Sequence, residues 1–226
     1  MKYLSYKISN IMKNTFLFAL ILCLSLTSFA QTNNFAVTYT LTINATAEDS
    51  EMMAQMMQGS TMILASDGTS TYMKNSMGMM GDQEVLVNSE TKEMTMFMSG
   101  MMGNMAFQGK SDALGEETPN SGKVTLINET KKILGRKCKK AIVEDNEGNT
   151  SVFWYTEDII LPKNSENMPT DLPGLALEMI ISTEGVDMTY TATDLKEDIS
   201  MKNYAIKIPE GVEIQPLDAI MNMGKM

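Results

Sequence analysis

The sequence predicts a mainly β fold, a single antiparallel meander of about ten strands with one short helix near its start. The segment "FAVTYTLTIN", residues 35–44, alternates apolar with polar residues, which is typical of a strand with one buried face. Turn sequences then recur between apolar runs, at Asp67-Gly68, at residues 146–149 and at Glu184-Gly185. Such turns join neighbouring strands into hairpins. Because no linker, long charge run or fixed repeat interrupts the pattern, we expect one domain over residues 31–226.

The expected strands follow one another at short intervals. They cover residues 35–44, 60–66, 69–75, 84–88, 93–98, 123–128, 137–145, 150–156, 175–182 and 187–195, with a closing strand at 204–209. One helix is expected at residues 49–58. Asp49 and Ser50 are capping residues, good helix formers follow them, and Gly59 is a stop signal.

Residues 1–30 have the three parts of a secretory signal peptide. Three lysines give a positive start, and the apolar run 15–26 is too short to span a bilayer comfortably. The small residues Ser28 and Ala30 then predict cleavage between Ala30 and Gln31. We therefore expect an exported protein, periplasmic or secreted, that is soluble and has no transmembrane segment after cleavage.

Cleavage would leave a strongly acidic chain that has no histidine. The formal net charge of the whole chain is −10, and removal of the three lysines would change it to −13. This charge disfavours nucleic acid as a partner. The lack of histidine excludes most zinc sites and any catalytic imidazole. Cys138 would be the one cysteine left, so no disulfide within the chain is expected.

Methionine is the unusual feature of the composition. The chain has 24, and 15 of them lie between Met52 and Met105. The expected helix carries an apolar stripe made of Met52, Met53, Met56 and Met57. On the expected strand 93–98, alternation places Met94, Met96 and Met98 on one face. We expect these two sets to face each other across an apolar cavity.

Three roles for the methionines stay open. Flexible, polarizable thioethers suit a pliable wall around a lipid-like or acyl-chain ligand. Thioethers are also soft ligands that select Cu(I). The candidates for a copper site are Met94, Met96, Met98, Met101, Met102 and Met105. Alternatively, methionine replaces leucine as core filler in a structural or protein-interaction domain. We take the first role as our prediction and expect no cofactor.

A basic stretch stands out in the second half of the chain. It contains Lys131, Lys132, Arg136, Lys137, Lys139 and Lys140. These residues fit either a contact for anionic headgroups or an acidic envelope partner, or an edge strand that lysines protect from mis-pairing. Cys138 lies among them; exposure there would lower its thiol pKa, whereas burial would make it a small apolar residue. Trp154, between two aromatic residues, is expected in the core.

The sequence gives little indication of catalysis. Its serines have no histidine to activate them. Its acidic residues are scattered among turns, and no spacing singles out a pair of carboxylates. We therefore predict that the protein is not an enzyme.

Residues 122–159 resemble a methionine-rich family of exported bacterial domains of unknown function. The resemblance rests on residues 131–138, a glycine-containing step into a lysine-rich strand, and on residues 154–158, a tryptophan strand that ends near an acidic pair. "DLPGLALEM", residues 171–179, resembles the motif that names the related GLPGLI family. "YAIKIPEGVEI", residues 204–214, resembles the closing strand of both.

Both families are similar to the LolA/LolB lipoprotein-carrier superfamily. That resemblance implies a strongly curved antiparallel sheet, an incomplete barrel, with a short helical lid over an apolar cavity. It does not imply lipoprotein transport, because fold alone does not determine function. We therefore predict a non-catalytic envelope protein that binds an apolar or lipid-like ligand in a methionine-lined cavity.

Overall fold

The computed structural model describes residues 31–45, 51–101, 103–114, 123–145, 148–161, 171–183 and 186–220. Internal contacts divide the chain into two units, residues 1–30 and residues 31–226. The expected signal peptide and the turn expected at Glu184-Gly185 lie outside the described residues, and so do residues 146 and 147 of the turn expected at 146–149.

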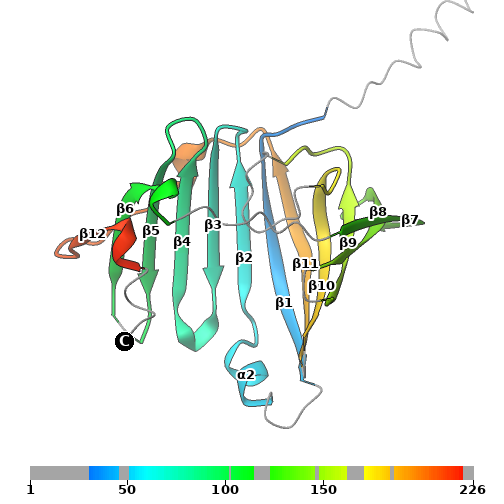
Figure 1. Cartoon of the computed structure of the whole chain (residues 1–226), viewed down its shortest axis with the longest axis horizontal. Helices are drawn as coiled ribbons and strands as arrows, with labels where there is room; N and C mark the ends of the chain where they lie inside the picture. The colour runs from blue at the N-terminus through cyan, green and yellow to red at the C-terminus, as the bar shows by residue number, and fades with distance from the viewer. Residues whose placement is uncertain are drawn as a thin grey trace, which may run out of the picture. The chain divides into compact units, whose positions relative to one another are not determined.

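The described part of the second unit is built on one twelve-stranded sheet (Figure 1). The strands are β1 (Phe35–Ala45), β2 (Thr61–Ser66), β3 (Ser70–Ser76), β4 (Asp82–Asn88), β5 (Glu93–Ser99), β6 (Met105–Lys110), β7 (Lys123–Ile133), β8 (Arg136–Glu144), β9 (Thr150–Thr156), β10 (Leu175–Thr183), β11 (Val186–Glu197) and β12 (Ile214–Pro216). Their order across the sheet is β12-β6-β5-β4-β3-β2-β1-β11-β10-β9-β8-β7. Within this sheet β12 pairs in parallel with β6, and the other pairs are antiparallel. The predicted mainly β fold is confirmed.

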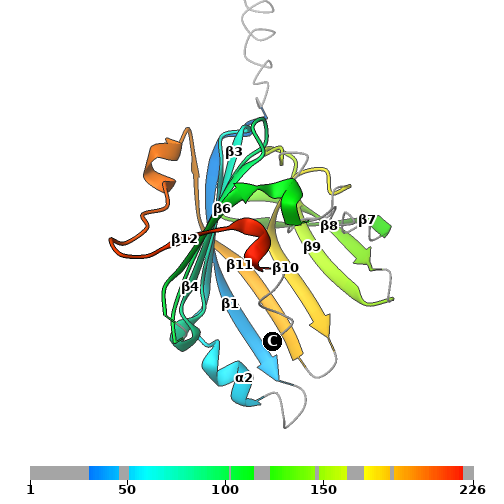
Figure 2. The ribbon, with the colours of Figure 1, turned by 60° about the vertical axis from the view of Figure 1, so that its left-hand side comes forward.

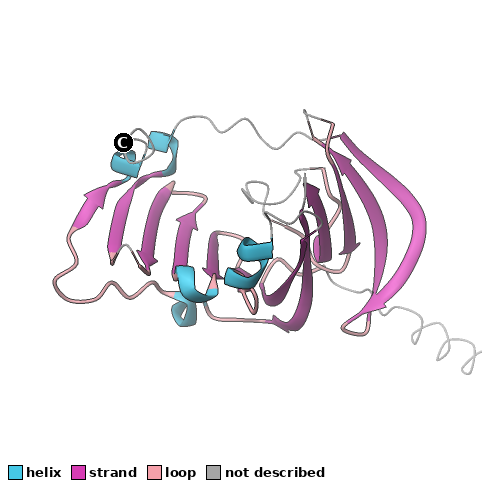
Figure 3. Ribbon diagram, turned by 90° about the horizontal axis from the view of Figure 1, so that it is seen from below, coloured by secondary structure: helices cyan, strands magenta, loops and turns pink. Residues whose placement is uncertain are grey.

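The sheet is curved and does not close. Seen from below, the row of strands bends (Figure 3), and when the view of Figure 1 is turned about the vertical axis, β9, β8 and β7 fan away from β4 (Figure 2). Register shifts interrupt the pairing of β1 with β11, of β10 with β9 and of β7 with β8. Such bulges increase local twist and bend a strand, which helps to explain the curvature. The predicted curved, open sheet is confirmed.

β1 lies at the middle of the sheet, between β2 and β11. Its alternation has the predicted effect: Phe35, Val37 and Tyr39 are fully buried on one face. Ala36, which points to the other face, is buried too. β1 therefore has packed residues on both sides, which is unusual for a strand that alternates in polarity.

Two hairpin turns show how local sequence sets the register. The Asp67 side chain accepts hydrogen bonds from the backbone N–H of Thr69 at 3.0 Å and of Ser70 at 2.7 Å, between β2 and β3. Between β7 and β8, Leu134 and Gly135 have φ angles of 50° and 77°. Two successive positive φ angles are typical of the tight turns that match strand twist.

Buried residues form three clusters. The large core contains sixteen buried residues from β1, β2 and β8–β11 and the nearby loops, among them Phe35, Tyr39, Tyr155 and Leu177. The methionine cluster has Val85, Met94, Phe107 and Leu217 at its centre. The strap cluster has Ala36, Ala65 and Tyr72, covered by Ile199, Met201, Tyr204 and Ile206. We use "strap" for residues 198–213, which connect β11 to β12.

Helices are few and short. They are α2 (Glu51–Met56) and the 3₁₀ segments η2 (Gly78–Met80), η3 (Ser111–Leu114), η4 (Met201–Tyr204) and η5 (Leu217–Ala219). The helix expected at 49–58 is thus present over Glu51–Met56, and residues 57 and 58 lie in the turn that follows it. It lies at one end of β1 (Figure 1), where it contacts β1 and η2.

One predicted strand is absent, and two strands were not predicted. The closing strand expected at 204–209 is absent: the strap begins with η4 and packs Tyr204 and Ile206 onto a face of the sheet. Apolar and polar residues alternate in this segment because the strap lies across a face of the sheet, and the side chains on one side of the strap pack on β2–β4. β6 and β12 were not expected. The methionine- and glycine-rich sequence before Met105 hid β6.

Candidate functional site

Strand β5 carries three methionines on one face. Met96 lies opposite Val85 of β4 and Phe107 of β6. Met94 is buried, and Met96 and Met98 are partly buried against the methionine cluster. The cluster thus places side chains of β3–β6 on one face of the sheet.

Residues near the C-terminus close one side of this cluster. Leu217 of η5 is 1% exposed and packs over β6 at Gly109. A Cβ at Gly109 would lie 2.9 Å from the Cβ of Leu217, so a larger residue would push η5 away. Glycine in β6 is therefore explained by the close approach of another segment.

The structure places the helix methionines elsewhere. Met52 is 73% exposed and Met56 is 38% exposed. Among the described residues, Met52, Met56 and Met57 belong to none of the three clusters, and the Met53 side chain is not described. The helix set and the strand set therefore do not form one described cluster. That either set binds a ligand stays a prediction.

The six methionines considered for copper have unlike surroundings. Met101 is 82% exposed, whereas Met94 is 3% exposed. Met98 and Met105 lie opposite each other in register, and Met102 lies outside the described residues. A search of the described residues finds no group of three or more His, Cys, Asp or Glu side chains that could hold a metal ion, which leaves thioether binding untested.

A cavity of about 270 Å³ lies between β1 and the α2 segment. Its lining consists of Leu41, Thr42, Ile43, Ala54, Gln55 and Gln58. The strand thus contributes apolar side chains and one threonine, and the helical segment contributes two amides. Among the described residues, no methionine and no charged residue lines it. The cavity suits a neutral ligand with both apolar and hydrogen-bonding groups.

Ser60, which lies between α2 and β2, has an unusual hydroxyl. The backbone N–H of Leu41 donates to the carbonyl of Ser60 at 2.9 Å, next to the pair Thr40–Thr61. Residues directly opposite in antiparallel strands place their side chains on the same face. The Ser60 side chain is therefore on the face of Leu41. Ser60 is 3% exposed, and its hydroxyl has no hydrogen-bond partner among the described residues.

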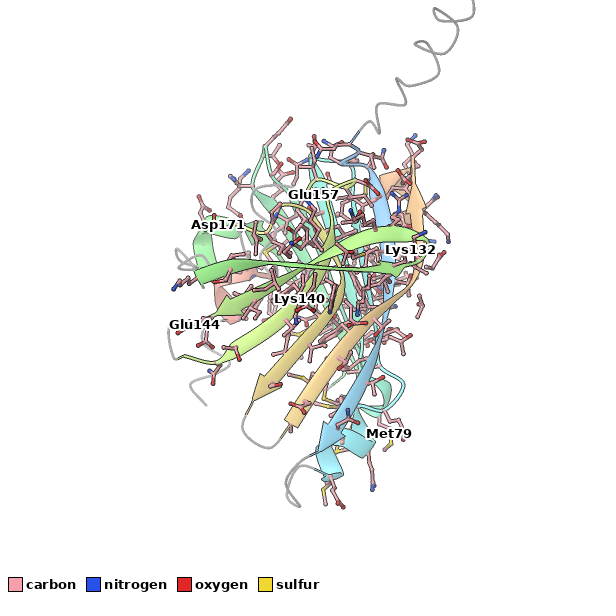
Figure 4. The ribbon with its side chains drawn as sticks, turned by 90° about the vertical axis from the view of Figure 1, so that its right-hand side faces the viewer. Met79, Lys132, Lys140, Glu144, Glu157 and Asp171 are labelled. Carbon is pink, nitrogen blue, oxygen red and sulfur yellow. The ribbon has the colours of Figure 1, made fainter. Side chains whose placement is uncertain are left out.

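The basic stretch forms the β7–β8 hairpin, with Lys132 near its tip and Lys140 within the strands (Figure 4). Four of the six basic side chains are paired with described acidic ones. The pairs are Lys131 with Glu178 at 2.5 Å, Arg136 with Asp158 at 3.2 Å and with Glu197, Lys139 with Glu157 at 2.7 Å, and Lys140 with Glu129 at 3.2 Å. Three of these basic residues therefore tie the hairpin to β10, β11 and the residues after β9, whereas Lys140 pairs within the hairpin. Lys132 and Lys137 lie opposite each other in register.

Trp154 and Cys138 have structural surroundings. Trp154 is partly buried against the large core, and the Lys131 Nζ lies 4.4 Å from the centroid of its ring. Cys138 is fully buried, and burial raises the pKa of its thiol. The alternative of an exposed thiol with a lowered pKa is wrong, because the Cys138 side chain packs in the large core.

Sequence reasoning missed a polar cluster on β3 and β4. The Tyr72 hydroxyl donates to Glu84 at 2.9 Å, and Lys74 lies 3.2 Å from Glu84 and 2.8 Å from Asp82. The hydrogen bond from Lys74 lowers the pKa of Asp82, and the same bond raises the pKa of Lys74. Burial, with help from Glu84, raises the pKa of Tyr72. The strap covers this cluster, since the ring of Tyr204 lies 5.6 Å from that of Tyr72.

Comparison with known proteins connects this domain with N-glycanases. The family profile described as N-glycanase peptide, N-terminal domain, matches residues 37–212, from β1 to near the end of the strap. The chain belongs to this family. Our prediction that the protein is not an enzyme is therefore contradicted, because the match places the chain in an enzyme family. The relations to the methionine-rich family and to the GLPGLI family, suggested above by resemblance, are not shown.

Similar solved structures are distant. PNGF-II, solved in space group P21, has 18% identity and a TM-score of 0.48, and the match covers 86% of this chain and 33% of PNGF-II. An uncharacterized conserved protein from Thermus thermophilus has 6% identity, a TM-score of 0.46 and coverage of 82% and 91%. The LolA superfamily protein NE2245 from Nitrosomonas europaea has 10% identity, a TM-score of 0.33 and coverage of 77% and 90%.

The chain thus spans about a third of the length of PNGF-II. TM-scores below 0.5 support no argument about function. No curated protein sequence matches the chain. Across the described residues, no helix is both long and apolar enough to cross a membrane.

Proposed function

We propose that this chain recognises the glycan-bearing substrate of an N-glycanase activity. The observation that carries the proposal is the family match over residues 37–212, which includes most of the sheet and the strap. Because the chain spans about a third of PNGF-II, the proposal concerns recognition, and glycan release by this chain is a separate outcome to be measured.

The cavity beside β1, whose described lining residues are uncharged, supports this proposal. Glycans present many uncharged hydroxyl groups, and Gln55 and Gln58 offer both hydrogen-bond donors and acceptors. The acidic composition also disfavours nucleic acid as an alternative polar polymer.

The test compares one glycoprotein before and after removal of its N-linked glycans. The chain from Gln31 onward would be immobilised, and binding of the two forms measured by biolayer interferometry. We expect the glycosylated form to bind and the deglycosylated form to bind at least tenfold more weakly. Equal binding of the two forms would refute the proposal. Mass spectrometry of a glycopeptide incubated with the chain would show whether it releases the glycan.

A second candidate is the binding of an apolar or lipid-like ligand at the methionine cluster. The observation that favours it is the partial exposure of Met73, Met96, Met98 and Met105 on that cluster. Uptake of a fluorescent fatty acid would test it, with Met96→Asp as the disrupting variant. Met52→Asp is the matched control, because Met52 is exposed and outside the cluster. Uptake that both variants retain, or no uptake by the wild type, would refute this candidate.

We also infer that the chain is exported and cleaved between Ala30 and Gln31, into the periplasm or outside the cell. The three-part leader sequence motivates this inference. The intact mass of the exported protein decides the matter: a mass that includes residues 1–30 would overturn it.

A further inference from the structure

We propose that a group of exposed methionines at one end of the sheet is a modification site, at which hypochlorous acid forms methionine sulfoxide while the fold stays intact. This group, the methionine fringe, consists of Met52, Met56, Met79, Met80 and Met101. None of the five belongs to the methionine cluster, and the inference does not depend on the proposed function. It is carried by the position of the fringe and by its exposure.

Three segments bring the fringe together. Met52 and Met56 are in α2, Met79 and Met80 are in η2, and Met101 lies in the turn after β5. α2 contacts η2, and the two lie at the same end of the sheet (Figure 2). Met79 is seen at this end, near α2 (Figure 4). Methionines that are distant in sequence are therefore gathered in one part of the fold.

Close backbone contacts fix these segments in place. A Cβ at Gly78 of η2 would lie 3.1 Å from the carbonyl oxygen of Met56. A Cβ at Gly81, just after η2, would lie 1.8 Å from the carbonyl oxygen of Ser99 at the end of β5. The φ angles of the two glycines are 55° and 103°, a region that other residues rarely adopt. The gathering of the fringe is therefore built into the backbone.

Exposure distinguishes the fringe from the buried methionines. Its exposed fractions range from 38% at Met56 to 82% at Met101, whereas those of Met94 and Met179 are 3% and 4%. Among the described residues, five of the nine exposed large hydrophobic side chains are these methionines. Oxidation of a sulfur requires access to it. Hypochlorous acid should therefore reach the fringe well before it reaches the buried methionines.

The reaction is a two-electron oxidation that needs no cofactor. The thioether sulfur takes the oxygen atom of hypochlorous acid, so that an S–O bond forms and the O–Cl bond breaks. Sulfur loses two electrons, chlorine leaves as chloride, and the proton of the acid passes to solvent. The sulfoxide is polar, and in a core it would disrupt packing. On exposed side chains the new oxygen contacts water, so the fold tolerates the modification.

Oxidation at the fringe would also spare the methionine cluster. Met96 and Met98 are partly buried against that cluster, where sulfoxides would disturb the packing. Because the fringe is more exposed, it consumes a limited amount of oxidant first. The fringe thus protects the apolar surface of β3–β6 by reacting in its place.

The experiment treats the purified protein with less than one equivalent of hypochlorous acid per fringe methionine. Mass spectrometry of its peptides then measures the sulfoxide at each methionine. The oxidised fraction of Met52, Met79, Met80 and Met101 should exceed that of Met94 and Met179 at least about tenfold. The midpoint of urea unfolding should be unchanged by this treatment. Similar oxidation of fringe and buried methionines, or a lowered midpoint, would overturn the proposal.

A variant tests whether the fringe protects the methionine cluster. It replaces the four most exposed members by leucine, with the changes Met52→Leu, Met79→Leu, Met80→Leu and Met101→Leu. At the same dose of oxidant, sulfoxide at Met96 and Met98 should rise about threefold, because its competitors are gone.

The matched control removes sulfur from the other region. Met94→Leu, Met96→Leu and Met98→Leu together should leave oxidation of the fringe unchanged. Circular dichroism verifies that both variants fold; if the fringe variant aggregates, glutamine at the same four positions replaces leucine and keeps the surface polar. Unchanged sulfoxide at Met96 and Met98 in the folded fringe variant would refute the protective role.

Discussion

The large core and the methionine cluster pack on the same sheet with different kinds of side chains. The large core has sixteen buried residues, many of them aromatic or branched, whereas the methionine cluster has four buried residues and eight partly buried ones around them. Aromatic and branched side chains have few rotamers and pack densely, while methionine is flexible and tolerates gaps. The difference teaches that β1 and β8–β11 hold most of the stability, and that β3–β6 present the more adaptable surface.

The largest expected effect tests this contrast directly. Leu177 is fully buried in the large core, so Leu177→Ala should lower the free energy of unfolding by about 3 kcal/mol. Met96 is partly buried in the methionine cluster. Met96→Ala should therefore lower the free energy of unfolding by only about 1 kcal/mol, because part of the methionine surface already contacts water. Urea unfolding of both variants measures the difference. Equal losses would mean that the two clusters are equally well packed, which contradicts the comparison.

A somewhat smaller effect is expected from a polar group inside the large core. The Tyr39 hydroxyl donates to the carbonyl of Ala176 at 2.6 Å, and both residues are fully buried. Tyr39→Phe would leave that carbonyl without its partner and should cost about 2 kcal/mol. Urea unfolding at pH 7 measures this loss. A loss below about 0.5 kcal/mol would mean that the hydroxyl adds little.

The same tyrosine gives the large core a defined pH dependence. Burial raises the pKa of Tyr39 above its ordinary value of 10.0, so the folded state favours the neutral phenol. Its contribution is complete below pH 10 and is lost as the pH rises further, because the unfolded chain ionises first. The wild type should therefore lose more stability than Tyr39→Phe between about pH 9.5 and 11. Urea unfolding of both proteins across this range measures the difference, and parallel losses would contradict the assignment to Tyr39.

Sequence predicted those parts of the fold that depend on local chemistry. Alternation located β1, and Asp67-Gly68 located the turn between β2 and β3, because both signals lie within a few residues. Residues 204–209 also alternate, but sequence alone does not say whether an extended segment pairs with an edge or crosses a face. The strap does the second, and its packing on Tyr72 depends on residues more than a hundred positions away.

The candidate sites were less predictable for the same reason. The sequence identified the methionine stripe of the helix and the methionine face of β5. It did not show that the two lie apart, because their positions depend on where α2 packs against β1. The cavity and the orphan hydroxyl of Ser60 depend on the register of β1 with β2, which no local pattern specifies. The family itself is visible only by comparison over residues 37–212.

A further prediction concerns the charges that hold the β7–β8 hairpin against the large core. Lys131 contacts both Glu178 and the ring of Trp154, and its side chain is 33% exposed. A double-mutant cycle with Lys131→Met and Glu178→Gln should give a coupling energy of about 1 kcal/mol, since partial exposure screens the pair. The coupling should weaken in high salt. A coupling near zero would mean that the hairpin is held by its backbone pairing alone.

The smallest effect is expected where all three methionines of β5 become leucine. Met94, Met96 and Met98 share one face, and leucine keeps nearly their volume while it removes the sulfur. The free energy of unfolding of the triple variant should therefore lie within about 1.5 kcal/mol of that of the wild type.

The same variant also tests what these methionines bind. If these side chains form an adaptable apolar surface, fatty acids of different length should bind the wild type with similar affinity and the stiffer leucine variant with a sharper preference. Loss of tight Cu(I) binding, measured against a competing chelator, would instead identify the sulfurs as ligands. A large loss of stability would show that this cluster is as closely packed as the large core, and the contrast between the two regions would be wrong.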